Sequence, residues 1–149
     1  MASNRIHAKG PFQYEEYVSA EAMLPGHLVE MLAAGTIQKH STAFGRNERM
    51  FVQEDALQGR TKTQTTTSGE ATPVIIPNMG SQVYALLKDG ETVVIGDRLG
   101  SAGDGTLQKF DEDSQGTDDF AVGVALEAKD LAADSLSTAQ LILIRIGAH

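Results

Sequence analysis

Residues 82–99 read QVYALLKDGETVVIGDRL, and this stretch predicts the fold. Apolar β-formers flank the Asp89-Gly90 pair, and both residue types adopt positive φ at low cost, as a tight hairpin turn requires. A second such pair follows at Asp104-Gly105. The two turns predict a meander of short antiparallel strands between Gly80 and Val124. Since no nucleophile, base or ligand set gathers here, the stretch favours a surface-binding β domain over an enzyme.

The composition is that of one ordinary globular domain. The chain has 149 residues, of which 41% are hydrophobic, so it can bury a core of its own. It has no cysteine, which excludes disulfides and thiolate metal sites. The longest apolar run, within residues 141–146, is too short to span a bilayer, and residues 1–7 lack the apolar segment of a signal peptide. We therefore expect synthesis in the cytosol.

The charge is acidic and unevenly distributed. A net charge of −8 argues against binding to the phosphate backbone of nucleic acid. Residues 1–50 are balanced, whereas residues 101–149 hold nine acidic and three basic side chains. In one interpretation the neutral end faces a partner and the acidic end faces water. In the other, the acidity only keeps the protein soluble.

Residues 1–20 are predicted to form an extended N-terminal arm. Apolar residues are sparse there, and Gly10-Pro11 interrupts any helix. The arm nevertheless carries Phe12, Tyr14 and Tyr17, which need a surface elsewhere to cover them. That surface belongs to the protein's own domain, to a sister subunit or to a different protein. With Arg5, these aromatics are the candidate contact residues.

Residues 21–149 are predicted to form a single β domain. The expected fold is mostly β, a compact antiparallel barrel or sandwich with short hairpins and at most one or two short helices. Residues 140–146 are apolar on both faces for most of their length, which predicts a strand that is central in the domain or lies under an oligomer contact. Further strands are expected at 28–32, 36–40, 50–53, 74–76 (at an edge, between Pro73 and Pro77) and 120–127 (with Val122, Val124 and Leu126 on one face). A helical turn is expected at 54–59, and a short helix or loop at 129–138.

No catalytic, metal or cofactor motif is apparent. The four histidines are His7, His27, His40 and His149, and none pairs with another at a metal-ligand spacing on a helix. Residues 100–103 lack the pattern of a nucleophile elbow, and no phosphate-binding glycine loop is present. Residues 111–116 match the first half of a calcium loop, but Val122 stands where a bidentate glutamate is needed. We therefore expect no enzyme, no metal and no cofactor.

The chain resembles the capsid cement (decoration) proteins of tailed bacteriophages. The similarity lies in the order of several short phrases, which together span most of residues 24–146: 24–29, 51–59, 83–87, 90–99 and 121–127. The resemblance implies a mostly β virion protein, made in the host cytoplasm, that binds the outside of the assembled head. It implies the major capsid protein as partner, a homotrimer as the favoured oligomer, and no catalytic residue. Residues 60–72 fit the family pattern least.

Two other functions stay open. A fibre or collar module could bind a receptor or sugar, with the threonine-rich stretch 60–72 as its tip. A carrier domain of the lipoyl or biotinyl type would present a modified lysine at a hairpin tip, and Lys88 beside Asp89-Gly90 is the candidate. Lys88 lacks the flanking residues of a carrier motif. A cement protein is the function that the sequence favours.

Overall fold

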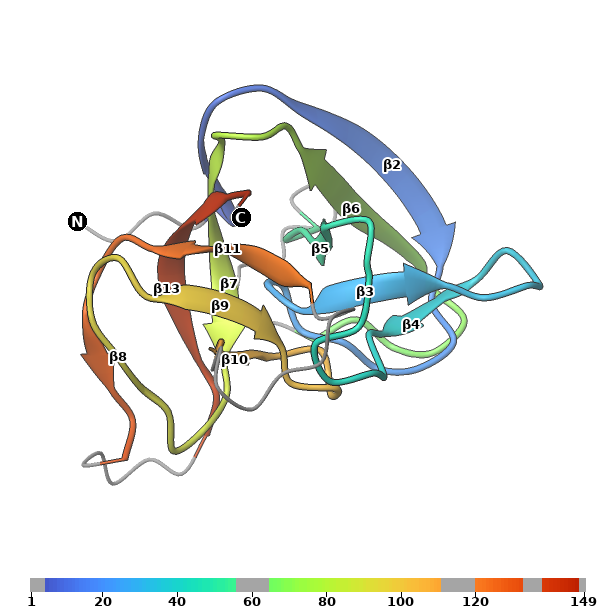
Figure 1. Cartoon of the computed structure of the whole chain (residues 1–149). Coiled ribbons are helices and arrows are strands. Elements are labelled where there is room, and N and C mark those ends of the chain that lie inside the picture. The colour runs from blue at the N-terminus through green and yellow to red at the C-terminus, as the bar shows by residue number, and fades with distance from the viewer. Residues whose placement is uncertain (1–4, 56–64, 111–119, 133–137, 148–149) are drawn as a thin grey trace.

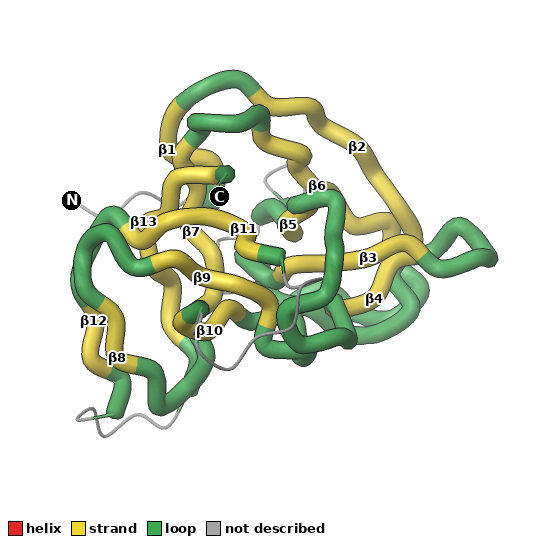
Figure 2. The backbone as a smooth tube through the Cα atoms, viewed as in Figure 1, coloured by secondary structure: helices red, strands yellow, loops and turns green. Residues whose placement is uncertain are grey.

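The computed structural model describes residues 5–55, 65–110, 120–132 and 138–147. Within these ranges the chain forms strands and turns and no helix, which confirms the predicted mostly β fold (Figure 2). The strands are β1 (His7–Lys9), β2 (Phe12–Val18), β3 (Leu28–Met31), β4 (Ile37–Lys39), β5 (Met50–Val52), β6 (Ala71–Pro77), β7 (Gln82–Leu87), β8 (Thr92–Val93), β9 (Arg98–Ser101), β10 (Leu107–Lys109), β11 (Ala121–Ala125), β12 (Lys129–Asp130) and β13 (Gln140–Ile146).

Five strands close into a ring, here called the C-terminal barrel (Figure 1). β7 pairs with β13, β13 with β11, β11 with β9, and β9 with β10, all antiparallel. The parallel pairing of Leu107 with Leu87 brings β10 back to β7 and completes the ring. β1 pairs with the start of β7 beside the ring. Closure gives the backbone groups of these strands partners on both sides.

The barrel encloses a core of aliphatic side chains. In β13 the buried residues alternate with more exposed ones, because successive side chains of a strand point to opposite faces. Ile142, Ile144 and Ile146 point inward, while Arg145 is exposed. The prediction of a central strand at 140–146 is therefore confirmed. The other fully buried barrel residues are Val83, Ala85, Leu87, Leu99, Leu107, Val122 and Ala125.

Five further strands form the N-terminal sheet, in the order β2-β6-β5-β3-β4. An isolated bridge between Ser19 and Ile37 brings its first and last strands together at one end. One face contributes Leu28, Phe51 and Ile75 to the barrel core. The other face covers a second cluster of buried residues, Met23, Val29, Ile37, Met50, Val52 and Val74. The sheet therefore lies between two cores.

The turn Leu24–His27 joins the sheet to the barrel. Pro25 and a left-handed Gly26 make it a tight turn, in which the His27 N–H donates to the Leu24 carbonyl at 3.2 Å. The Gly26 N–H donates a hydrogen bond to the Val52 carbonyl in the sheet, and the Gly26 carbonyl accepts one from the Leu86 N–H in the barrel. The positive φ of Gly26 favours glycine here, and a Cβ would also lie 2.6 Å from the end of the Leu141 side chain, which would have to move.

The two Asp-Gly pairs behave differently. Asp104-Gly105 lies between β9 and β10, which pair as the predicted hairpin. Asp89-Gly90 forms a turn closed by a 3.2 Å hydrogen bond from Glu91 to Lys88, but the flanking strands do not pair with each other. Only Gly90 has positive φ there, which fits a type II turn and not the hairpin type I′. The predicted first hairpin was wrong: β7 pairs with β13, and β8 with β12.

Several other expected elements need correction. The strand at 74–76 is internal, since β6 lies between β2 and β5. The two prolines of β6 are tolerated because neither has to donate a hydrogen bond to β5. Pro73 lies opposite Gln53, at the end of β5, and its carbonyl accepts a hydrogen bond from the Gln53 N–H. Pro77 lies beyond the other end of β5. A bulge between Ala121 and Gly123 breaks the alternation expected in β11, so Val122 is buried and Val124 is not.

The strands expected at 28–32, 36–40 and 50–53 are confirmed as β3, β4 and β5. Glu54 and Asp55 are not helical, and the rest of the helical turn expected at 54–59 lies outside the described residues. Residues 129–130 form β12 where a helix or loop was expected, while 133–137 lie outside the description. Residues 5–19 pair with the rest of the domain through β1 and β2. The division into an arm and a domain stays a prediction.

Replacement of Ile144 by aspartate tests the barrel core. Ile144 is fully buried in the centre of β13, so Ile144→Asp would place an unpaired charge among aliphatic side chains. We expect the free energy of unfolding to fall by about 3–5 kcal/mol, against about 1 kcal/mol for Ile144→Val. Denaturant unfolding measures both values. Equal stability of the aspartate variant and the wild type would show that β13 does not form the core.

The turn Leu24–His27 also predicts a pH dependence. The neutral ring of the buried His27 accepts a 2.9 Å hydrogen bond from the Leu24 N–H at Nδ1. Burial, with a smaller effect of Lys39, lowers the pKa of His27 to about 4. An unfolded histidine titrates near pH 6.5, so the unfolded chain binds a proton that the folded chain excludes. Stability from this group is complete above about pH 6.5 and falls as the pH drops toward 4.

His27→Asn is the matched control, because its amide oxygen can accept the same hydrogen bond without titrating. Between pH 7 and pH 4 we expect the wild type to lose about 3 kcal/mol more than this variant. Burial also acts on Glu30 and Asp104, but hydrogen bonds outweigh it and lower the pKa of each carboxyl. The hydrogen bonds to Glu30 and Asp104 are common to both proteins, and His27 adds only the smallest of the effects on Asp104, so the difference reports His27 together with that coupling. Parallel loss of stability in the two proteins would contradict the assignment.

Candidate functional site

Three of the exposed large apolar side chains of the N-terminal sheet lie on one face of β2. Phe12, Tyr14 and Val18 are separated by even numbers of residues and therefore point to the same side. Their exposed fractions are 37%, 49% and 46%. Three large apolar side chains in one row on a single strand are more than the scattered exposure of an ordinary surface. We call this row the β2 surface.

β2 is also an edge strand. Among the described strands it pairs with β6 alone, from Phe12 opposite Pro77 to Val18 opposite Ala71. In an antiparallel pair every second residue directs its N–H and C=O away from the partner strand, so along this edge β2 presents backbone groups that no other described strand pairs. Glu15 and Glu16 lie in the middle of the strand, and charged residues on an edge oppose indiscriminate pairing. In Figure 1, β2 lies on the outer side of the molecule.

The structure separates the four candidate contact residues. Phe12 and Tyr14 belong to the β2 surface, and the Phe12 ring lies 4.3 Å from that of His7. Tyr17 points to the opposite face and packs against the second core cluster. Arg5 is exposed just before β1. Sequence reasoning did not single out Val18, although its even spacing from Phe12 and Tyr14 on a predicted strand would have placed it on their face.

Tyr14 keeps its proton as a hydrogen-bond donor. Its hydroxyl donates to the Glu16 carboxylate at 2.9 Å, between two side chains on the same face of β2. Burial raises the pKa of Tyr14 to about 12, and the Glu16 hydrogen bond and the nearby acidic charges add to this. The phenol is therefore neutral at physiological pH, and its hydrogen bond to Glu16 restrains the ring on this face of the strand. A fixed aromatic ring is a favourable contact group because little rotamer entropy is lost on binding.

A buried histidine and serine form a second cluster, which the sequence did not reveal. The His40 Nε2–H donates to the Arg46 carbonyl at 3.0 Å, so Nδ1 is the acceptor for the Ser101 hydroxyl at 2.6 Å. The Glu30 carboxylate lies 4.0 Å from Nε2. Ser101 has no exposed surface and also accepts from the Gly103 N–H. A substrate cannot reach such a hydroxyl, so the cluster is a structural link between sheet and barrel.

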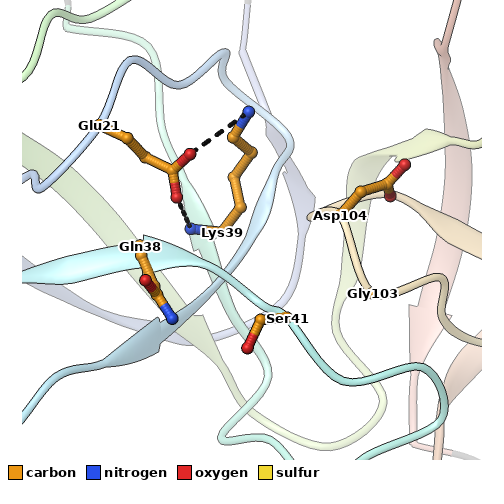
Figure 3. A pocket seen from close by; sticks show the side chains of 6 residues that line it. All are labelled: Glu21, Gln38, Lys39, Ser41, Gly103 and Asp104. Carbon is orange, nitrogen blue, oxygen red and sulfur yellow. Dashed lines mark hydrogen bonds and ion pairs between the residues drawn. The ribbon is translucent and has the colours of Figure 1, made fainter.

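A polar pocket of about 240 Å³ lies between β4 and the β9–β10 hairpin (Figure 3). Its charged groups are largely occupied with one another. The Glu21 carboxylate accepts from the Lys39 backbone N–H at 3.1 Å and lies 3.6 Å from the Lys39 ammonium. The Asp104 carboxylate accepts from the Thr106 N–H at 3.1 Å. The remaining lining residues are Gln38, Ser41 and Gly103.

The other sequence candidates receive little support. Lys88 is exposed beside a turn whose strands do not form a hairpin, so it does not occupy the tip position of a carrier domain. The acidic stretch 111–119 lies outside the described residues, as does 60–64 of the threonine-rich stretch. Thr66 of that stretch pairs with Met23, and residues 71–72 belong to β6. Within the described ranges, no three histidine, aspartate or glutamate side chains cluster as metal ligands, and no helix is suited to crossing a membrane.

Comparison with known proteins identifies the fold. No protein-family model matches the chain, and a search of curated proteins finds no significant match. Among solved structures, the head fibre gp8.5 N base of bacteriophage phi29 is similar, with a TM-score of 0.59 and 14% sequence identity. The match covers 92% of this chain and 95% of that one. Nearly the whole chain therefore shares its fold with a part of a phage head fibre.

Proposed function

We propose that this protein is a non-enzymatic structural protein of a phage virion that binds the outer surface of the assembled head and bridges major capsid protein subunits. The observation that carries the proposal is the β2 surface: three exposed apolar side chains on an edge strand. The fold shared with a phage head fibre base supports a place on a phage head. The resemblance of the sequence to capsid cement proteins favours the bridging role.

The energetics of such a role are simple. A protein that binds only the assembled shell stabilises it by mass action, because its binding free energy is lost when the shell comes apart. Apolar side chains that are already exposed and ordered on a strand supply this contact at a small entropic cost. A homotrimer, which the family resemblance favours, would place three β2 surfaces on one particle. Weak single contacts would then add up through their high effective concentration.

A second candidate function is the base of a head fibre, and the similarity to the phi29 structure favours it specifically. Both functions place the protein on the head, and they differ in arrangement. A cement protein covers the shell in many copies and increases its resistance to heat. A fibre base attaches an appendage, so its removal would take fibres from the head and leave the heat stability of the shell unchanged. Counting copies per particle, with imaging of particles that lack the protein, separates the two.

The double variant Phe12→Ala/Tyr14→Ala tests the β2 surface. Both side chains are exposed, so we expect the variant to fold with stability close to that of the wild type. Loss of two aromatic anchors should weaken binding by about 100-fold, since such residues contribute about 1–2 kcal/mol each or more at an interface. Co-sedimentation with assembled heads of the phage that carries this protein measures the affinity. Deletion of residues 1–20 is a poorer test, because it removes β1 and β2.

Met31→Ala is the matched control. Met31 is a large apolar side chain at the end of β3 with an exposed fraction of 38%, similar to that of Phe12. Its loss should leave binding to the heads unchanged. Undiminished binding by the β2 variant, or an equal loss in both variants, would refute the assignment of the contact to the β2 surface.

A further inference from the structure

The most exposed apolar pair in the described part of the barrel lies at the turn Val94–Asp97, between β8 and β9. Val94 and Ile95 have exposed fractions of 56% and 69%, although the sequence pattern predicts that they continue a strand. Met79 stands at the corresponding position of the turn Asn78–Ser81 and is 58% exposed, but it is a single flexible side chain whose end lies near Gly147. The pair at Val94 and Ile95 therefore needs an explanation of its own.

The turn is held rigidly from several directions. The Asp97 N–H donates to the Val94 carbonyl at 3.1 Å, and the Asp97 carboxylate accepts from the Val94 N–H at 2.9 Å. Gly96, with φ of 96°, donates its N–H to the Ala125 carbonyl at 2.9 Å, and the Asp97 carbonyl accepts from the Ala125 N–H at 2.8 Å. Lys109 lies 3.5 Å from the Asp97 carboxylate. Two stiff β-branched side chains are thus presented to solvent on a fixed support.

This turn and the β2 surface lie on different parts of the molecule. The turn belongs to the barrel, and β2 belongs to the N-terminal sheet. In Figure 1 the connection from β8 to β9 is at the left side and β2 is at the upper right. A single compact contact region on one neighbouring subunit therefore does not cover both the turn and the β2 surface.

The size of the pair restricts its occupant. Two side chains fall far short of the roughly 800 Å² that each partner buries in a stable complex. The turn therefore cannot hold a second copy of this chain, or any other protein, from free solution. It can add a contact only when another surface has already placed the molecule. On a shell, that other surface is the β2 surface, and the neighbour within reach is a further coat subunit.

We propose that Val94 and Ile95 form a second anchor, which inserts into an apolar pocket of a coat subunit other than the one that contacts the β2 surface. The inference rests on the proposed function and adds to it the second contact that bridging requires. Pre-organisation of the turn reduces the entropy lost when the pair is buried. Apolar burial by both anchors then links two subunits through one rigid domain.

Cross-linking from single cysteines tests the proposal, because the chain has no cysteine of its own. Val18→Cys, Ile95→Cys and the control Ala34→Cys, which is exposed in the β3–β4 turn, each receive a maleimide benzophenone. After the labelled variants have bound to assembled heads of the phage that carries this protein, we expect photoproducts with the coat protein from positions 18 and 95 and none from position 34. The doubly labelled Val18→Cys/Ile95→Cys variant should yield one chain joined to two coat subunits.

The outcomes separate the two hypotheses. Coat products from position 18 but not 95, or a double product that contains one coat subunit, would overturn the second anchor and leave the proposed function standing. A product of two copies of this chain from position 95 would do the same. Absence of coat products from both positions would overturn the proposed function as well. As a second readout, Val94→Thr/Ile95→Thr should weaken binding to heads by about tenfold.

Discussion

Closure of the C-terminal barrel by β13 is the interaction on which the rest of the structure depends. β13 pairs with β7 on one side and β11 on the other, while Ile142, Ile144 and Ile146 fill the interior. β7 in turn pairs with β1, and its Leu86 N–H donates to Gly26 in the turn that leads to the N-terminal sheet. A chain in which β13 did not close the ring would leave both neighbouring strands with free edges and an open core. The attachment of the sheet would also lose its support.

The closed barrel restricts where this protein can bind other molecules. Strands that pair on both sides offer no backbone groups, so adhesion must use an edge strand or the turns between strands. Among the described residues, exposed apolar side chains occur at both kinds of place. The β2 surface lies on an edge of the N-terminal sheet, and the pair Val94 and Ile95 lies on a turn of the barrel. Both are peripheral to the cores, so they can change without loss of the fold.

The sequence predicted what is determined locally. Apolar patterns correctly predicted β3, β4, β5 and β13. The Asp104-Gly105 pair correctly predicted the hairpin of β9 and β10. Asp89-Gly90 has the same residues but forms a type II turn, because the partner of β7 is β13, more than fifty residues later. The prolines of β6 indicated an edge, yet the shortness of β5 lets them lie within the sheet. The turn type and the place of β6 in the sheet depend on strands that are distant in the sequence, and a local sequence pattern does not show which strands will pair.

The same distinction applies to the sites. The aromatics of β2 were visible in the sequence because they stand in a segment with few other apolar residues. Val94 and Ile95 were hidden in a run that reads as a strand, and their exposure follows from a turn that hydrogen bonds to β11. His40 and Ser101 are separated by 61 residues, so their contact could not be foreseen from spacing.

The fold alone does not choose between a cement protein and a fibre base, since either needs a rigid body with exposed contacts. The number and placement of those contacts do discriminate. An appendage base needs one attachment to the head, whereas a bridge needs contacts that two different subunits can occupy together. A single patch of apolar side chains would satisfy the first requirement. Two separate patches, on the sheet and on the barrel, are what the second requirement calls for, and the proposed bridging role depends on both of them being occupied together.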